Sequence, residues 1–144
     1  HLSEIKEKMS IFCLSHRDMP IWNVLINNSG MFGILDWEFA RFNHNPFQDP
    51  FHLLIHTKLN NSKKPTTYLL DRVLSNKNNK QLIVSFGESI GVSDPKLIYS
   101  ALIYYLWDWY SLEQDNADQP DQGEEYLECL TWLKQNENSN KYFI

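Results

Sequence analysis

Apolar positions fall in short runs through the first third of the chain and at helical spacing through the remainder. The short runs are too brief for helices and predict β-strands at residues 11–14, 24–26 and 31–35. Residues 27–30 join the last two runs and read Asn-Asn-Ser-Gly, which is typical of a hairpin turn because Asn and Gly tolerate positive φ. We therefore expect a β-hairpin that returns Asp36 to the same end as Asn23.

The remainder of the chain shows the spacing and the boundary signals of α-helices. The pattern predicts helices over residues 50–59, 66–75, 80–90, 95–112 and 124–135. Asp49 before Pro50 and Asp94 before Pro95 are start signals, because a short acidic side chain can cap a helix whose first position is proline. Gly91 is a stop signal. Residues 3–10 are polar and compatible with a further short helix.

Composition fits one globular domain spanning residues 1–144, of the α+β class and mostly α. The chain is 42% hydrophobic and 14% aromatic, enough to fill a core. Its net charge of −5 argues against a nucleic-acid partner. The longest apolar stretch, residues 97–112, is short for a bilayer and carries Asp108, so we expect no membrane association. Cys13 and Cys129 lack metal-ligand spacing, and a cytoplasmic location is expected.

The stretch HRDMPIWN, residues 16–23, contains the residue types that phosphoryl transfer requires. The reaction needs a carboxylate to orient the attacking hydroxyl and accept its proton, and oxygen ligands for Mg²⁺. Asp18 is the candidate base in this stretch. The expected hairpin places Asp36 beside Asn23, which makes these two residues candidate metal ligands.

This spacing resembles the catalytic loop of the kinase-like phosphotransferases, which is written HRDxxxxN. His16, Asp18 and Asn23 match that motif, and Asp36 stands where the second metal-binding Asp of the family ends the hairpin. The resemblance implies the mostly helical C-terminal lobe of that fold. It also implies Mg²⁺ and ATP or GTP as cofactors, with Asp18 as the catalytic residue.

The residues after Asp36 distinguish branches of the superfamily. Asp36 is followed by Trp37-Glu38 rather than by Phe-Gly, no APE-like segment follows, and Pro20 stands where a Ser/Thr protein kinase usually carries Lys. The chain therefore resembles the aminoglycoside phosphotransferase and choline kinase branch, which phosphorylates small molecules. Resemblance to that branch implies that Asp49 braces the catalytic loop and that Glu38 assists at the metal.

Residues before Ser15 include no glycine-rich phosphate loop and none of the strand lysine and partner glutamate that hold ATP in this family. We therefore expect an N-terminal nucleotide-binding lobe to be absent from this chain. Either the lobe is part of a longer polypeptide, or the chain alone is inactive. The alternative function is a non-catalytic binding or scaffold protein that keeps the lobe and has lost transfer.

Two groups of residues in and near the motif also allow simpler interpretations. His16 is expected to support the loop through a ring hydrogen bond to the backbone near Asp36, and Arg17 to form a surface ion pair. Asp49, His52 and His56 could imitate a metal site at helical spacing. We predict instead a helix cap followed by partly exposed histidines, because the HExxH glutamate is missing.

Asp108 shares a helix face with apolar residues, so its carboxylate requires a partner. One candidate is a cationic substrate held by cation–π contacts to Trp107, Trp109 or Tyr110, and an internal Arg or Lys is equally possible. The acidic residues between 113 and 125 are either a solvated loop or the lining of a pocket for a polycation. Aminoglycosides, choline, ethanolamine, sugars and amino alcohols all fit as substrates, and the oligomeric state is not readable.

Overall fold

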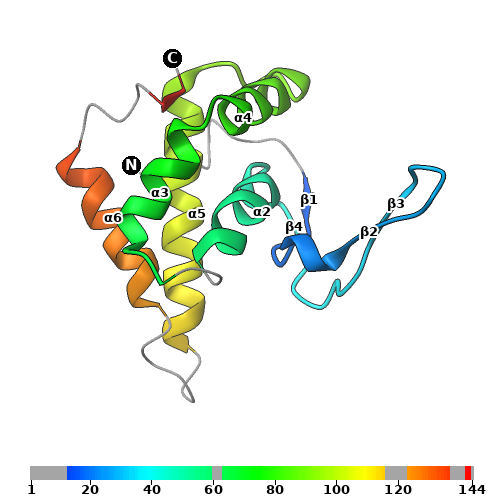
Figure 1. Ribbon diagram of the computed structural model, residues 1–144, viewed down its shortest axis with the longest axis horizontal. Coiled ribbons are helices and arrows are strands. Elements are labelled where there is room, and N and C mark those ends of the chain that lie inside the picture. The colour runs from blue at the N-terminus through cyan, green and yellow to red at the C-terminus, as the bar shows by residue number, and fades with distance from the viewer. Residues whose placement is uncertain (1–12, 60–62, 116–122, 137–141, 144) are drawn as a thin grey trace.

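The computed structural model describes residues 13–59, 63–115, 123–136 and 142–143. The described chain is α+β and mostly helical, with two small antiparallel sheets beside a helical body (Figure 1). The predicted helix at residues 3–10 lies outside the described residues, as do residues 11–12 of the first predicted strand and most of the acidic segment. The expected fold class is confirmed at this level.

Five helices form the described body, and all five were predicted. They are α2 (Gln48–Leu59), α3 (Thr66–Ser75), α4 (Lys77–Ser89), α5 (Pro95–Asp115) and α6 (Glu124–Gln135). The start of α4 was predicted three residues late, because its cap was overlooked: the side chain of Asn76 accepts hydrogen bonds from the backbone N–H groups of Asn78 and Asn79. The start of α2 was also wrong. This helix begins at Gln48, so Asp49 lies in its first turn and is not its cap.

The core is built around α5, which stands between α2 and α6 in Figure 1. This helix is buried or partly buried through most of its length because apolar residues occur nearly all round it. It packs against α2 and α6, and its fully buried side chains are Ile98, Ala101, Leu102, Tyr105 and Leu106. The candidate site therefore rests on a rigid helical support.

The predicted hairpin is present as β2 (Val24–Ile26) paired with β3 (Phe32–Ile34). The second strand was predicted at residues 31–35, so β3 is one residue shorter at each end. The side chain of Asn27 accepts hydrogen bonds from the backbone of Ser29 and Met31, and Gly30 takes a φ of 79°. The second sheet pairs β1 (Leu14–Ser15) with β4 (Arg41–Phe42). The hairpin extends away from the helices (Figure 1).

Large apolar side chains are exposed throughout the segment that includes the hairpin. Among the described residues between 14 and 42, those exposed by 47% or more are Leu14, Ile21, Trp22, Leu25, Ile26, Met31, Phe32, Leu35, Trp37, Phe39 and Phe42. An apolar surface of this extent exceeds what scattered single residues produce. In the helical body most apolar side chains are instead buried or partly buried.

Every helix within the described ranges is either too short or too polar to cross a membrane.

Candidate functional site

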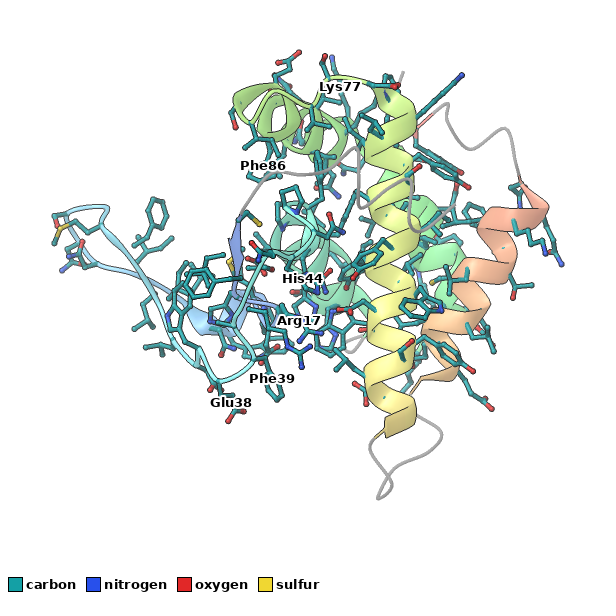
Figure 2. The ribbon with its side chains drawn as sticks, turned by 180° about the vertical axis from the view of Figure 1, so that it is seen from behind. Arg17, Glu38, Phe39, His44, Lys77 and Phe86 are labelled. Carbon is teal, nitrogen blue, oxygen red and sulfur yellow. The ribbon has the colours of Figure 1, made fainter. Side chains whose placement is uncertain are left out.

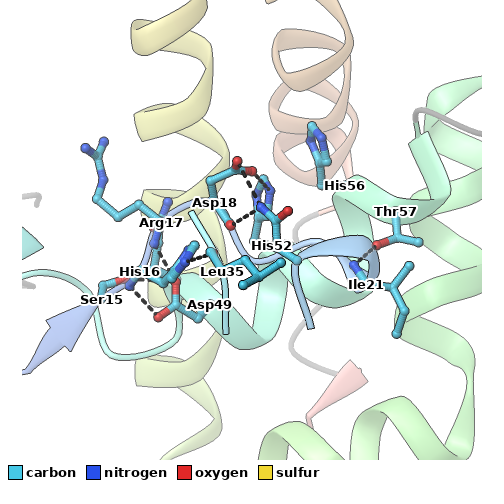
Figure 3. Close-up of polar contacts among 12 residues, drawn as sticks. Ser15, His16, Arg17, Asp18, Ile21, Leu35, Asp49, His52, His56 and Thr57 are labelled. Carbon is cyan, nitrogen blue, oxygen red and sulfur yellow. Dashed lines mark hydrogen bonds and ion pairs between the residues drawn. The ribbon is translucent and has the colours of Figure 1, made fainter. Parts of the chain in front are cut away.

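The loop at residues 15–18 is attached to the first turn of α2 by the carboxylate of Asp49 (Figure 3). One oxygen accepts hydrogen bonds from the Ser15 hydroxyl at 3.0 Å and from the Arg17 backbone N–H at 2.7 Å. The other accepts from the His16 backbone N–H at 2.8 Å. Bonds to an ionised acceptor are stronger than neutral ones, so this carboxylate fixes the loop against α2. Asp49 thus makes the contacts expected of a residue that braces the loop.

The Arg17 side chain points inward from this loop. It is 2% exposed, and its guanidinium lies 2.9 Å from the Asp108 carboxylate on α5. The predicted surface ion pair is therefore wrong, because the pair is buried between the loop and the body. In Figure 2, Arg17 and His44 lie between the loop and α5, whereas Glu38 and Phe39 lie at the outer edge. Arg17 also takes a φ of 70°, uncommon for a side chain of this size.

Asp108 therefore has the internal cationic partner that its position on α5 required. Gln48 donates to the same carboxylate oxygen at 3.3 Å, and a ring nitrogen of His44 lies 3.5 Å from it. Burial raises the pKa of Asp108, but the contacts from His44 and Arg17 outweigh burial and hold that pKa below its ordinary value. Its charge is accordingly balanced without a cationic substrate.

The aromatic residues expected to hold such a substrate do not form a common cage. Two positions along a helix turn through about 200°, so Trp107 and Trp109 leave α5 on opposite sides, whereas Tyr110, three positions after Trp107, lies nearer the face of Trp107. Trp107 is 43% exposed, whereas Trp109 stacks inside the protein on the His52 ring at 4.5 Å. Of the acidic segment, Glu113 is described near the end of α5, and Glu124 and Glu125 in the first turn of α6.

His16 connects the loop to the end of the hairpin. Its side chain is 1% exposed, and its Nε2 atom lies 2.7 Å from the backbone oxygen of Leu35. The ring also meets the Trp37 ring edge to face at 4.6 Å. The ring contact predicted for His16 is thus present at the residue immediately before Asp36.

Asp18 ends the loop with its side chain 23% exposed. Asn23 donates its side-chain N–H to the backbone oxygen of Asp18 at 3.1 Å and to carboxylate oxygen Oδ2 at 3.3 Å. Oxygen Oδ1 lies 3.3 Å from His52 Nε2 (Figure 3). The hydrogen bond from His52 lowers the pKa of Asp18, against the opposing effect of burial. Asp18 is thus a carboxylate at neutral pH and can accept a proton.

The candidate metal ligands, Asn23 and Asp36, lie at the base of the hairpin. The backbone N–H of Leu35 donates to the backbone oxygen of Asn23 at 3.0 Å, which brings the following residue, Asp36, to the end where Asn23 lies. Asp36 is exposed and takes a φ of 64°, the left-handed conformation that Asp tolerates better than most residues. Glu38 is also exposed.

The donor chemistry at this base suits Mg²⁺, which prefers oxygen and is usually bound through one or two carboxylates together with phosphate and water. Asn23 commits its side-chain nitrogen to Asp18, so its side-chain oxygen is the atom available to a cation. Among the described residues, no three His, Cys, Asp or Glu side chains gather closely enough to hold a metal ion.

His52 is the residue of this region that the sequence pattern missed. The predicted partial exposure is wrong for His52, which is 0% exposed, whereas His56 one turn later is partly buried. The His52 ring stacks on the His56 ring at 4.3 Å and on the Trp109 ring at 4.5 Å. A signal did exist: three residues along a helix return to the same face, so His52 had to lie near the loop that Asp49 holds.

Both histidines are neutral at pH 7. Burial lowers the pKa of His52, and burial together with the nearby His52 ring lowers the pKa of His56 to about 4. The Nδ1 atom of His56 lies 2.8 Å from the hydroxyl of Tyr126 on α6. These rings therefore pack as uncharged aromatic groups between α2, α5 and α6.

Acid is expected to destabilise the fold through His56. Between its ordinary pKa of 6.5 and its folded pKa of about 4, the unfolded chain binds a proton that the folded chain does not. The free energy of unfolding should thus fall as pH drops through this window, by about 2 kcal/mol after allowance for partial exposure. Urea unfolding at pH 7 and pH 4.5 would measure this fall. His56→Gln should show a smaller fall, and equal falls in the two proteins would contradict the assignment.

Neither family models, nor curated proteins, nor solved structures match this chain.

Proposed function

We propose that this chain is the C-terminal lobe of a kinase-like phosphotransferase that moves the γ-phosphate of ATP or GTP to a hydroxyl group of a small molecule. The observation that carries the proposal is the group at the base of the hairpin. Asn23 is bonded to Asp18 at 3.3 Å, and the pairing of Leu35 with Asn23 returns Asp36 to the same place. These contacts support a site in which a base and two hard oxygen ligands for a cation lie at one end of the hairpin.

In this proposal Asp18 is the catalytic residue. Its carboxylate accepts a hydrogen bond from the substrate hydroxyl, orients that oxygen for in-line attack and takes up its proton. Asn23 and Asp36 would hold Mg²⁺, with Glu38 assisting from the following turn. The cation, when bound, would offset charge on the phosphates. His16 and Asp49 support this arrangement, because they hold the hairpin and the loop in place.

The acceptor is proposed to be a small molecule with a hydroxyl group, in keeping with the Trp37-Glu38 pair after Asp36. A cationic acceptor remains a candidate through the exposed Trp107, although the charge of Asp108 is already balanced by Arg17. Cys13 and Cys129 are free thiols, which suits the proposed cytoplasmic location.

A second function is a non-catalytic binding or scaffold role for the same lobe. The observation that favours it is the exposed apolar surface of the hairpin segment, which suits contact with another macromolecule. The two functions predict different results for Asp18. A phosphotransferase loses turnover when Asp18 is replaced, whereas a non-catalytic binding protein has no turnover to lose.

The test is phosphoryl transfer by the protein as it occurs in the cell, assayed with Mg-ATP and Mg-GTP against aminoglycoside, choline, ethanolamine and sugar acceptors. Asp18→Asn should lower turnover by about 10²-fold to 10⁴-fold, because the base is lost while the amide keeps the shape of the side chain. The shift of Tm on adding nucleotide should persist in this variant. Equal turnover in the two proteins would refute the catalytic role. If nucleotide raised the Tm of the wild type and of Asp18→Asn but neither protein showed turnover, the binding role would be favoured.

A further inference from the structure

His52 contacts the candidate base from inside the protein. Its ring lies on the face of α2 that points to the loop, and its Nε2 atom is 3.3 Å from Asp18 Oδ1 (Figure 3). Nε2 approaches Oδ1 obliquely, and in the described part of the chain this nitrogen makes no hydrogen bond of ordinary geometry. Hydrogen bonds to catalytic groups are often poorly aligned before the substrate binds. The contact therefore identifies Asp18 as the natural acceptor for His52.

The ring of His52 is packed against two aromatic neighbours. It stacks on His56 and on Trp109, with interplanar angles of 20° and 22°. Its Nδ1 atom lies 3.4 Å from the hydroxyl of Tyr105, which is itself fully buried on α5. A fully buried ring that stacks on two neighbours and directs both nitrogens at polar groups is restricted in orientation, so it can serve as a fixed reference for Asp18.

The chemistry of the contacts selects one tautomer. The ionised carboxylate of Asp18 has no proton to give, so Nε2 must carry the hydrogen. A neutral ring then leaves Nδ1 as an acceptor, and the Tyr105 hydroxyl, which also contacts Tyr126, is placed to donate to it. Burial raises the pKa of Tyr105 well above its ordinary value, which keeps this hydroxyl protonated. The contacts thus form an ordered chain of donors that runs from Tyr105 through His52 to Asp18.

We propose that His52 is a positioning residue: its Nε2–H group holds the Asp18 carboxylate in the orientation that accepts the proton of the substrate hydroxyl, and Tyr105 fixes the tautomer that makes this possible. Asn23 holds the other carboxylate oxygen, Oδ2, from the loop side. The carboxylate is then fixed from both sides before substrate arrives, as a pre-organised base requires. The kinetic consequence of this inference rests on the proposed function. The tautomer of His52 does not depend on turnover.

The kinetic test compares three variants. His52→Leu removes the donor and keeps apolar volume, and it should lower kcat roughly tenfold or more with the nucleotide KM unchanged. His52→Gln retains an N–H donor and should recover most of kcat. His56→Leu removes an adjacent stacked ring whose Nδ1 atom faces Tyr126 on α6, so the kcat of this variant should stay within a few-fold of the wild type. Equal kcat values in His52→Leu and His56→Leu would overturn the inference.

The structural test requires no turnover. Nitrogen-15 NMR of histidine-labelled protein distinguishes a ring nitrogen that carries hydrogen from one that does not. His52 should have hydrogen on Nε2 and none on Nδ1 at neutral pH, and Tyr105→Phe should mix the two tautomers. A doubly protonated ring, or hydrogen on Nδ1 in the wild type, would overturn the inference. A wild type without turnover whose His52 carries hydrogen on Nε2 would refute the proposed function and leave the positioning contact supported.

Discussion

Arg17→Met is expected to lower the free energy of unfolding by about 3–5 kcal/mol. The substitution keeps most of the volume of a side chain that is 2% exposed and removes its charge. Asp108 then remains ionised and largely buried, with Gln48 and His44 as its remaining partners. An unpaired buried charge costs more than the pair contributes, which is why the predicted loss is large. Chemical denaturation followed by far-UV circular dichroism at pH 7 would measure it.

The double variant Arg17→Met with Asp108→Leu is the control for this prediction. When both charges are replaced by apolar groups, no charge remains without a partner, so the double variant should be more stable than Arg17→Met alone. A loss below about 1 kcal/mol in Arg17→Met would show that the pair behaves as a surface ion pair does. The difference in stability between the single and the double variant also shows how strongly the contact with α5 stabilises the loop.

Asp49→Ala is expected to cost about 3 kcal/mol or more and to loosen the loop at residues 15–18. The substitution removes the acceptor of two backbone N–H groups, those of His16 and Arg17, in residues that are almost fully buried. Urea unfolding would give the stability, and amide hydrogen exchange at His16 and Arg17 would report the loosening.

Ser15→Ala is the matched control, because Ser15 donates only its hydroxyl to the same carboxylate. This variant should lose about 1 kcal/mol and leave the backbone bonds to Asp49 in place. If Asp49→Ala and Ser15→Ala lost the same free energy, the backbone bonds would contribute little. The loop would then have to be held mainly by the ion pair between Arg17 and Asp108.

Local signals in the sequence predicted the five helices and the hairpin, but they missed β4 and placed the first strand, expected at 11–14, too early. The hairpin follows from Asn27 and Gly30, and the start of α5 follows from Asp94 before Pro95, because each depends on conformations that neighbouring residues impose. The start of α2 failed for an instructive reason. The carboxylate of Asp49 was expected to cap its own helix, but it accepts hydrogen bonds from a loop more than thirty residues earlier. Local preference was overridden by a tertiary contact.

The site could be predicted only in part, because several of its contacts join residues that are far apart in the sequence. The apolar neighbours of Asp108 indicated that its charge needed a partner, yet Arg17 stands 91 residues away and nothing local selected it over a bound cation. The burial of His52 depended similarly on Trp109, which covers its ring from α5. The ring contact of His16 was predictable because the hairpin itself defines which backbone lies beside it.

The hairpin has a thermodynamic consequence for the proposed cation site. A two-stranded ribbon is marginally stable in water, and this one is held to the body near its base, by His16 against Leu35 and by Ile21 against Thr57. Asp36 reaches Asn23 only while the strands are paired. The apparent affinity for the cation is then the intrinsic affinity multiplied by the fraction of molecules with the hairpin closed. Any partner that covers the exposed apolar side chains raises that fraction, and so tightens cation binding without touching a ligand.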